Sequence, residues 1–467
     1  MRRLRATAAA VVLLILNAAA VSGQCVSSVD IISERGTTPR FLAGPSAWNG
    51  SMLLVAGPEL DREEFQLRLY DQFGHPLYPS EKIRSSGENL IDVLWTGTEF
   101  GVFHETSEEI LALTRVNTVG KALDPRVIEI DDIELLGDDQ ADVAWSSQDN
   151  EYIVAHTLTS GGQRDIIVSW VQRDGSVAKQ TTIDDASLDS FVRVAIAASG
   201  TIGIFYEDEK ANEVYYVAIN GDVKRKPVRV WDSGDDVLVA ARGNEFALLR
   251  RVDAGSDSIV RWQIIDTSAQ IIRRDSRIFL GTGGDVEPVA LLAIPGEYAL
   301  SYLEWTEGLG NGDAYYRLAR FGLDEERISD TYFSAATGNR RRRERTDFPF
   351  EWTGSAYVSL VSNENGDDQD TYFVRYCPLR ATVSAPRFAR AGQVVTFTAS
   401  ADGGVPGYAY TWTWGDFGTA QGPTMQLSFP SNGEQHVTLT VRDSTGTVTT
   451  AEFHIAIGDP RHRAVRK

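Results

Sequence analysis

From about residue 45 to residue 378, hydrophobic and polar segments follow one another in an order that repeats. Each copy opens with a short hydrophobic stretch that runs into a turn, often through a tryptophan. The clearest copies are centred on Trp48, Trp95, Trp145 and Trp352. Weaker copies occupy residues 194–196, 239–241 and 291–293. The pattern therefore predicts seven copies, each of about 45 to 50 residues.

The second half of each copy also repeats, as an alternating strand that ends in a glycine turn. The glycines are Gly74, Gly120, Gly175, Gly221 and Gly322, and the fifth copy has Ala269 at this position. With a further short strand, each copy contains four strands. Four-stranded repeats of this length are typical of propeller blades. We predict an all-β fold with a seven-bladed β-propeller over residues 24–378, and six or eight blades remain open.

The last copy lacks one strand, which the beginning of the mature chain can supply. Only three strands fit between Trp352 and the change in composition near residue 378, while residues 25–33 (CVSSVDIIS) form a spare strand before the first copy. Adding it to the last blade would close the ring and remove exposed sheet edges. It would also place Cys25 opposite Cys377, the only two cysteines in the chain. We expect a disulfide between them, and two separate thiols are the alternative.

Residues 1–23 have the features of a secretory signal peptide. Arg2, Arg3 and Arg5 precede an apolar stretch over residues 8–20, and small residues follow it. No later segment approaches the length of a membrane-spanning helix. The formal net charge of −20 argues against binding nucleic acid through its phosphates. We expect a secreted protein, extracellular, periplasmic or at the cell surface, without membrane insertion.

The repeat resembles the Trp-x-Gly repeats of secreted bacterial β-propeller proteins. The motif occurs at residues 48–50, 95–97 and 352–354, and apolar strands, acidic loops and glycine turns follow it. The resemblance covers most of residues 45–378. It implies a fold and an extracellular setting, and it implies no reaction.

A second domain follows the repeats. After a predicted linker at residues 379–386, residues 387–458 alternate like an immunoglobulin-like β-sandwich, and a basic tail occupies residues 459–467. Residues 410–417 (YTWTWGDF) resemble the signature of polycystic kidney disease (PKD) domains, commonly Trp-Asp-Phe-Gly-Asp-Gly. The resemblance implies a core role for Trp412, a turn at residues 415–416, and a spacer or binding module in a secreted protein.

Two positions depart from that signature. Thr413 stands where aspartate is usual, and Phe417 stands where glycine is usual. The missing carboxylate weakens any inference of a calcium site in this domain. Trp414 is expected on the surface as a strand neighbour of Trp412, and a sugar-stacking platform is the alternative.

The connections between the second and third strands of the blades are acidic. They cover residues 59–64, 105–109, 207–213, 253–257, 307–313 and 363–370. Because these connections share one face of a propeller, we expect a negative surface that attracts cations or a basic partner. The candidate binding residues are Glu207, Asp208, Asp313, Asp367, Asp368, Asp370 and Trp414. Solvated loops without a ligand are the alternative.

Calcium is the one cofactor that this face suggests. Oxygen ligands are most closely spaced in the segment around Gly366. The candidate ligands are Asn363, Asn365, Asp367, Asp368 and Asp370. Their spacing differs from that of the calcium loop that ends in glutamate.

The sequence contains no recognised catalytic motif: it has no G-x-S-x-G elbow, HExxH pair, Walker loop or dinucleotide fingerprint. We therefore expect a monomeric, non-catalytic binding or adhesion protein that recognises extracellular polysaccharide or protein. A carbohydrate-active enzyme with catalytic carboxylates in the central channel is one alternative. An extracellular scaffold for protein assembly is the other.

Overall fold

The computed structural model describes residues 30–31, 44–58, 64–84, 90–106, 110–124, 126–132, 141–160, 163–183, 188–208, 212–232, 235–254, 257–278, 285–305, 314–322, 327–332, 350–365, 368–404, 406–415, 418–444 and 446–458. Every regular element among these residues is a β-strand, which confirms the predicted all-β fold. No helix capable of crossing a membrane occurs in this part of the chain. The described residues divide into two compact units, one within residues 27–376 and one within residues 377–467.

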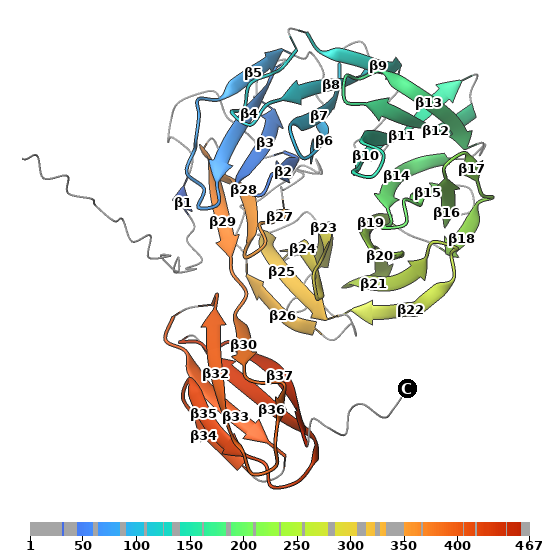
Figure 1. The fold of residues 1–467 in the computed structure, drawn as a ribbon. Helices are drawn as coiled ribbons and strands as arrows, with labels where there is room; N and C mark the ends of the chain where they lie inside the picture. Colours follow the sequence, from blue (N-terminus) through green and yellow to red (C-terminus); the bar gives the residue numbers. More distant parts are fainter. Residues whose placement is uncertain are drawn as a thin grey trace, which may run out of the picture. The chain divides into compact units, whose positions relative to one another are not determined.

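In the described part of Ser27–Tyr376, the strands form seven small antiparallel sheets (Figure 1). The first contains β2 (Ser46–Trp48), β3 (Met52–Pro58), β4 (Glu64–Asp71) and β5 (Glu81–Arg84). The second contains β6 (Leu90–Trp95), β7 (Phe100–Glu105), β8 (Ile110–Val116) and β9 (Ile128–Asp132). The third contains β10 (Ala141–Ser146), β11 (Glu151–Ser160), β12 (Gln163–Gln172) and β13 (Val177–Ile183).

The remaining four sheets continue in chain order. The fourth contains β14 (Leu188–Ile196), β15 (Ile202–Asp208), β16 (Glu213–Asn220), β17 (Val223–Lys224) and β18 (Val228–Trp231). The fifth contains β19 (Asp235–Arg242), β20 (Glu245–Ala254), β21 (Asp257–Asp266) and β22 (Ile271–Ile278). The sixth contains β23 (Asp285–Ile294), β24 (Glu297–Trp305), β25 (Ala314–Gly322) and β26 (Arg327–Tyr332). The seventh contains β27 (Phe350–Trp352), β28 (Tyr357–Asn365), β29 (Asp368–Tyr376) and β1 (Asp30–Ile31).

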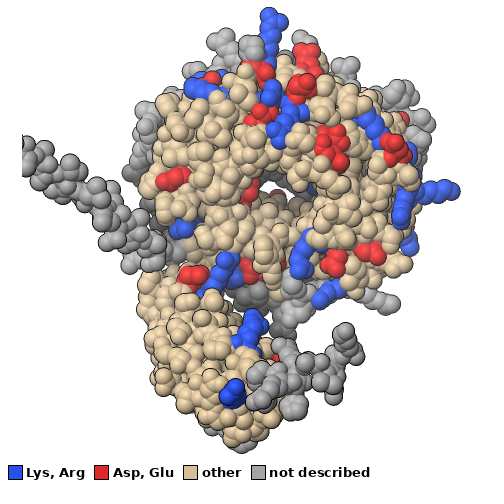
Figure 2. All heavy atoms as spheres, viewed as in Figure 1, with Lys and Arg blue, Asp and Glu red and all other residues tan. Residues whose placement is uncertain are grey.

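The innermost strands of these sheets contact one another in a closed cycle. In order, the contacts join β2, β6, β10, β14, β19, β23 and β27, and β27 returns to β2. Buried hydrophobic clusters of the described residues fill the junctions between successive sheets. The unit is therefore a propeller-like ring of sheets (Figure 1), and Figure 2 shows an opening at its centre. Burial between sheets, rather than within one, holds the ring together.

The N-terminal strand joins the last sheet, which confirms that part of the prediction. β1 pairs antiparallel with β29, so that Asp30 lies opposite Phe373 and Ile31 lies opposite Tyr372. This pairing covers an edge of the seventh sheet that would otherwise be open. Cys377 follows β29 directly and is buried. Cys25 lies outside the described residues, so the Cys25–Cys377 disulfide stays a prediction.

The turns between the third and fourth strands place one residue in the left-handed region of the backbone. The φ angle is 86° at Gly74, 76° at Gly120, 84° at Gly175 and 57° at Gly221. Ala269 takes this place in the fifth sheet, with φ 67°. Its N–H donates to the carbonyl oxygen of Asp266 at 3.0 Å, and Oδ1 of Asp266 accepts from the N–H of Gln270 at 2.9 Å. The turn thus holds Ala269 in the left-handed conformation, in which the Cβ of an L-residue lies too close to the following carbonyl oxygen.

Replacing Ala269 with glycine is expected to stabilise the ring by about 1 kcal/mol or slightly less. Glycine relieves the strain of the left-handed conformation. The gain is reduced because the unfolded chain becomes more flexible and because the Ala269 methyl packs against the core. Chemical denaturation measures the change. The reciprocal variant is Gly221→Ala. An added Cβ at Gly221 would touch nothing, so this variant should lose stability only because alanine is strained at a positive φ angle. A loss of stability in Ala269→Gly would contradict the argument.

The second unit is a sandwich of two sheets. One contains β30 (Arg380–Ser384), β32 (Val394–Asp402) and β35 (Thr424–Ser428). The other contains, in spatial order, β31 (Phe388–Ala389), β37 (Val448–Ile457), β36 (Gly433–Arg442), β33 (Ala409–Trp414) and β34 (Gly418–Gln421). Trp412 is fully buried, and its Nε1 donates to the carbonyl oxygen of Gly422 at 2.9 Å. The predicted core role of Trp412 is confirmed.

The structure corrects the predicted linker at residues 379–386. This segment contains β30, which pairs with β32 as part of the sandwich. Leu379 is buried, and Ala381 and Val383 pack against the same hydrophobic cluster. The apolar residues alternate with polar ones because one side of the strand faces the core. The sandwich therefore begins near residue 378 rather than at residue 387.

Candidate functional site

The predicted acidic surface is described only in part. Glu207 and Asp208 end β15, where Asp208 lies opposite Glu213 at the start of β16. Glu207 is buried, 6% exposed. Asp313 and Asp367 lie outside the described residues. The structure thus brings two of the predicted residues to one hairpin end, and the common acidic face stays a prediction.

The candidate calcium segment is the hairpin that joins β28 to β29. Its register places Asn363 opposite Asp370 and Asn365 opposite Asp368. The intervening Asp367 and the side chains of these four residues lie outside the description. Among the described side chains, no group of three or more His, Cys, Asp or Glu residues is arranged to hold a metal ion. The calcium site therefore stays a prediction.

Trp414 lies at the end of β33 and packs against the hydrophobic cluster of the sandwich. It is partly buried, and Gly418 on the adjacent strand lies directly beside its indole ring. A Cβ added to Gly418 would come within 2.2 Å of a Trp414 ring atom. Part of the ring is therefore covered by protein, and a role in binding sugar stays a prediction.

Asp142 is a carboxylate on the inner edge of the ring. Its Oδ2 accepts a hydrogen bond from the backbone N–H of Val194 in β14 at 2.6 Å, so it joins the inner strands of the third and fourth sheets. Burial raises the pKa of Asp142 to about 6, while Arg193 and two backbone N–H groups oppose that rise. Because β14 is the first strand of its sheet, this bond pairs one N–H on an otherwise open edge.

Glu351 has the same kind of role at the junction between the last and first sheets. The hydroxyl of Ser46 in β2 donates to Oε1 of Glu351 in β27 at 3.3 Å. Burial raises the pKa of Glu351 to about 8, and the bond from Ser46 opposes this rise. The carboxyl group therefore carries a proton at neutral pH. An uncharged Glu351 can lie between two inner strands at a lower desolvation cost than a carboxylate.

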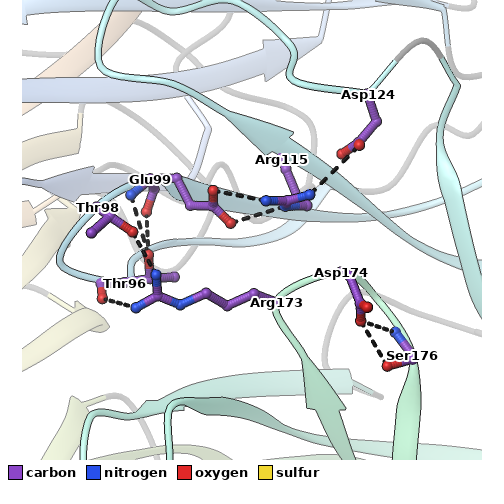
Figure 3. A network of polar contacts seen from close by, with 8 residues as sticks. All are labelled: Thr96, Thr98, Glu99, Arg115, Asp124, Arg173, Asp174 and Ser176. Carbon is purple, nitrogen blue, oxygen red and sulfur yellow. Dashed lines mark hydrogen bonds and ion pairs between the residues drawn. The ribbon is translucent and has the colours of Figure 1, made fainter.

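A polar network joins the second and third sheets (Figure 3). Glu99, in the turn before β7, accepts two hydrogen bonds from Arg115 of β8, at 2.9 and 3.0 Å. Arg173, in the turn after β12, donates to the carbonyl oxygen of Thr96 and to the hydroxyl of Thr98. Its guanidinium also lies 5.2 Å from the ring centre of Trp145. One arginine thus ties the turn of one sheet to the tryptophan of the next.

The Glu–Arg pair recurs at the equivalent place in the sixth sheet, where it is buried. Oε1 of Glu297, the first residue of β24, accepts a bond from Nε of Arg320 in β25 at 2.9 Å. Both side chains are 9% exposed. The hydroxyl of Tyr357, in the seventh sheet, donates to the same oxygen of Glu297. This network therefore joins two neighbouring sheets.

The sequence interpretation missed these networks, although a signal for them exists. In four copies a glutamate directly precedes an aromatic residue at the start of the second strand. The pairs are Glu99-Phe100, Glu151-Tyr152, Glu245-Phe246 and Glu297-Tyr298. A glutamate that recurs at a fixed place between apolar strands indicates that it pairs with a buried or half-buried side chain. The partner's identity varies, since Glu151 accepts from Gln172 instead of an arginine.

Residues 378–457 match the PKD domain family, which agrees with the signature in β33. No curated protein matches the chain. Similar solved structures include a chain from a study of two prolyl endopeptidases, at 12% identity and TM-score 0.43, covering 77% of this chain and 54% of that one. The extracellular domain of a hybrid two-component system of B. thetaiotaomicron has 9% identity and TM-score 0.43, and the match covers 93% of this chain and 59% of that one. The Dos1 propeller has 10% identity and TM-score 0.42, and the match covers 75% of this chain and 96% of that one.

This chain thus spans between half and two thirds of the first two of these solved chains. At such identities and scores, the likenesses assign no activity to it.

Proposed function

We propose that this chain is a secreted, non-catalytic binding or adhesion protein. Its ring is a seven-bladed β-propeller closed by the N-terminal strand, and a PKD-like domain follows. It recognises an extracellular polysaccharide or protein through the acidic connections of the propeller and through the PKD-like domain. The observation that carries the proposal is that two half-buried carboxylates of the inner strands, Asp142 and Glu351, each bond to the neighbouring inner strand.

The positions of these carboxylates support a structural role. Asp142 bonds to β14 and Glu351 bonds to β2, and two inner strands, β2 and β6, separate β27 from β10 around the ring. Glycoside hydrolysis needs two carboxylates on either side of one bond, about 5 to 10 Å apart. Each of these two carboxylates already bonds to the next inner strand and so helps to hold the ring together. Binding through surface connections leaves these groups in that role.

The experiment that tests the proposal offers the mature chain to arrays of polysaccharides and extracellular proteins, with and without Ca²⁺. The same samples are assayed for released reducing sugar. We expect binding without release. Loss of binding on chelation, and in Asp368→Asn/Asp370→Asn, would support the calcium site, and the exposed Asp222→Asn is the matched control.

Two further variants separate the proposal from the enzyme alternative. Asp142→Asn and Glu351→Gln keep the shapes of the two side chains and replace each carboxyl group with an amide. The proposal expects both to bind as the unmodified chain does. Release of sugar that disappears in either variant would overturn the proposal in favour of a carbohydrate-active enzyme. Binding confined to proteins would favour the scaffold alternative.

A further inference from the structure

Two histidines lie side by side on the outer face of the five-stranded sheet of the sandwich. His436 of β36 is directly opposite His454 of β37 in the antiparallel register. Their ring centres are 4.2 Å apart, and the ring planes make an angle of 68°. The neighbours Val437 and Phe453 are buried, so the two imidazoles are on the opposite, solvent-facing side.

Two glutamates flank this pair, one on each strand. Oε1 of Glu434 lies 3.5 Å from Nδ1 of His454, and Oε2 of Glu452 lies 3.9 Å from Nε2 of the same ring. Both glutamates are exposed, at 65% and 74% of their side chains. Each nitrogen of His454 therefore has a carboxylate near it. Whichever nitrogen binds a metal, the other can donate its proton to a glutamate.

The backbone beneath the pair is fixed on both sides. β37 is hydrogen bonded to β31 and β36, and β36 is hydrogen bonded to β37 and β33. The two histidines therefore start from a fixed separation, and little chain ordering opposes the binding of a ligand to both. The imidazole nitrogen is a ligand for Zn²⁺, Cu²⁺ and Ni²⁺, whereas Ca²⁺ and Mg²⁺ prefer oxygen.

We propose that His436 and His454 form a binding site for a divalent transition-metal ion of the Zn²⁺, Ni²⁺ and Cu²⁺ class. One nitrogen of each ring binds the ion, and water fills the remaining positions. Glu434 and Glu452 add negative charge and hold the uncoordinated ring nitrogen of His454. The site belongs to the second unit and uses none of the oxygen ligands of the calcium candidate, so the two sites can be tested separately.

The test is calorimetric titration of the untagged full chain with Zn²⁺, Ni²⁺ and Cu²⁺. We expect one ion per chain at this pair and the tightest binding for Cu²⁺. His436→Gln and His454→Gln should each weaken binding at least about tenfold, the lower end of the loss caused by removing a supporting residue. Glu434→Gln should weaken it less, and an excess of Ca²⁺ should not compete.

The matched control is His75→Gln, which removes an exposed histidine from the other unit and should leave the titration unchanged. Circular dichroism checks that the variants are folded, which we expect because both target side chains are exposed. As a second measurement, Zn²⁺ should raise the unfolding temperature of the unmodified chain but not of the His436→Gln/His454→Gln variant. Unchanged binding in both single variants would overturn the proposal, as would no binding at all.

Discussion

Replacing Glu297 with alanine is expected to cost the ring about 3 to 5 kcal/mol of unfolding free energy. Glu297 is buried and accepts bonds from Arg320 and Tyr357. Burial alone would lower the pKa of Arg320, but the hydrogen bonds that Arg320 donates to Glu297 raise it, so the guanidinium stays charged. Without Glu297, a buried cation and a buried hydroxyl lose their acceptor. Denaturant unfolding followed by far-ultraviolet circular dichroism measures the loss.

A second glutamate that pairs with an arginine and a tyrosine serves as a control. It shows whether the loss of stability in Glu297→Ala comes from burial of the pair or from pairing alone. Glu213 also accepts from an arginine and a tyrosine, Arg229 and Tyr215, but here the side chain of the arginine is 57% exposed. Glu213→Ala should therefore lose much less stability, because water replaces the lost partners. The double variant Glu297→Leu/Arg320→Met should recover part of the loss, since it removes the unpaired cation. A loss in Glu297→Ala no greater than that in Glu213→Ala would show that the cation finds another partner or water.

The strand order was predictable from the sequence because it depends on local features. Glycine is favoured where φ is positive, so the spacing of Gly74, Gly120 and Gly175 marks the turns between third and fourth strands. Alternation of apolar and polar residues marks the strands themselves. The missing strand of the last copy and the spare N-terminal strand then predicted the pairing of β1 with β29.

The side-chain networks were not predictable because their partners are far apart in sequence. Glu297 and Arg320 are separated by 23 positions, and Glu297 and Tyr357 by 60. Ser46 and Glu351 are separated by 305 and meet only when the ring closes. The sequence around the short strand β30 predicts a linker because prolines lie on both sides of it, whereas the structure pairs the strand with β32. The alternation in β36 and β37 places His436 and His454 outward, but only the register shows that they are opposite each other.

Replacing Glu351 with glutamine is expected to leave stability unchanged in acid and to increase it by a few kcal/mol above pH 8. The pKa of Glu351 is about 8 in the folded ring, against 4.5 for an unperturbed glutamate, because burial disfavours the charged form. Between these values the folded state holds a proton that the unfolded state releases, so stability falls as pH rises. The fall is about 1.4 kcal/mol per pH unit and ends near pH 8, where both states are ionised.

The measurement is the difference in unfolding free energy between Glu351→Gln and the unmodified chain at pH 4, 6 and 9. Because every other titrating group is common to both, the difference isolates Glu351. It should be near zero at pH 4 and grow in favour of glutamine up to pH 9. Asp222→Asn, at an exposed carboxylate of the ring, should show no such growth. A difference independent of pH would mean that Glu351 is already ionised in the folded ring, and that the junction between the first and last sheets holds a charged carboxylate bonded to Ser46.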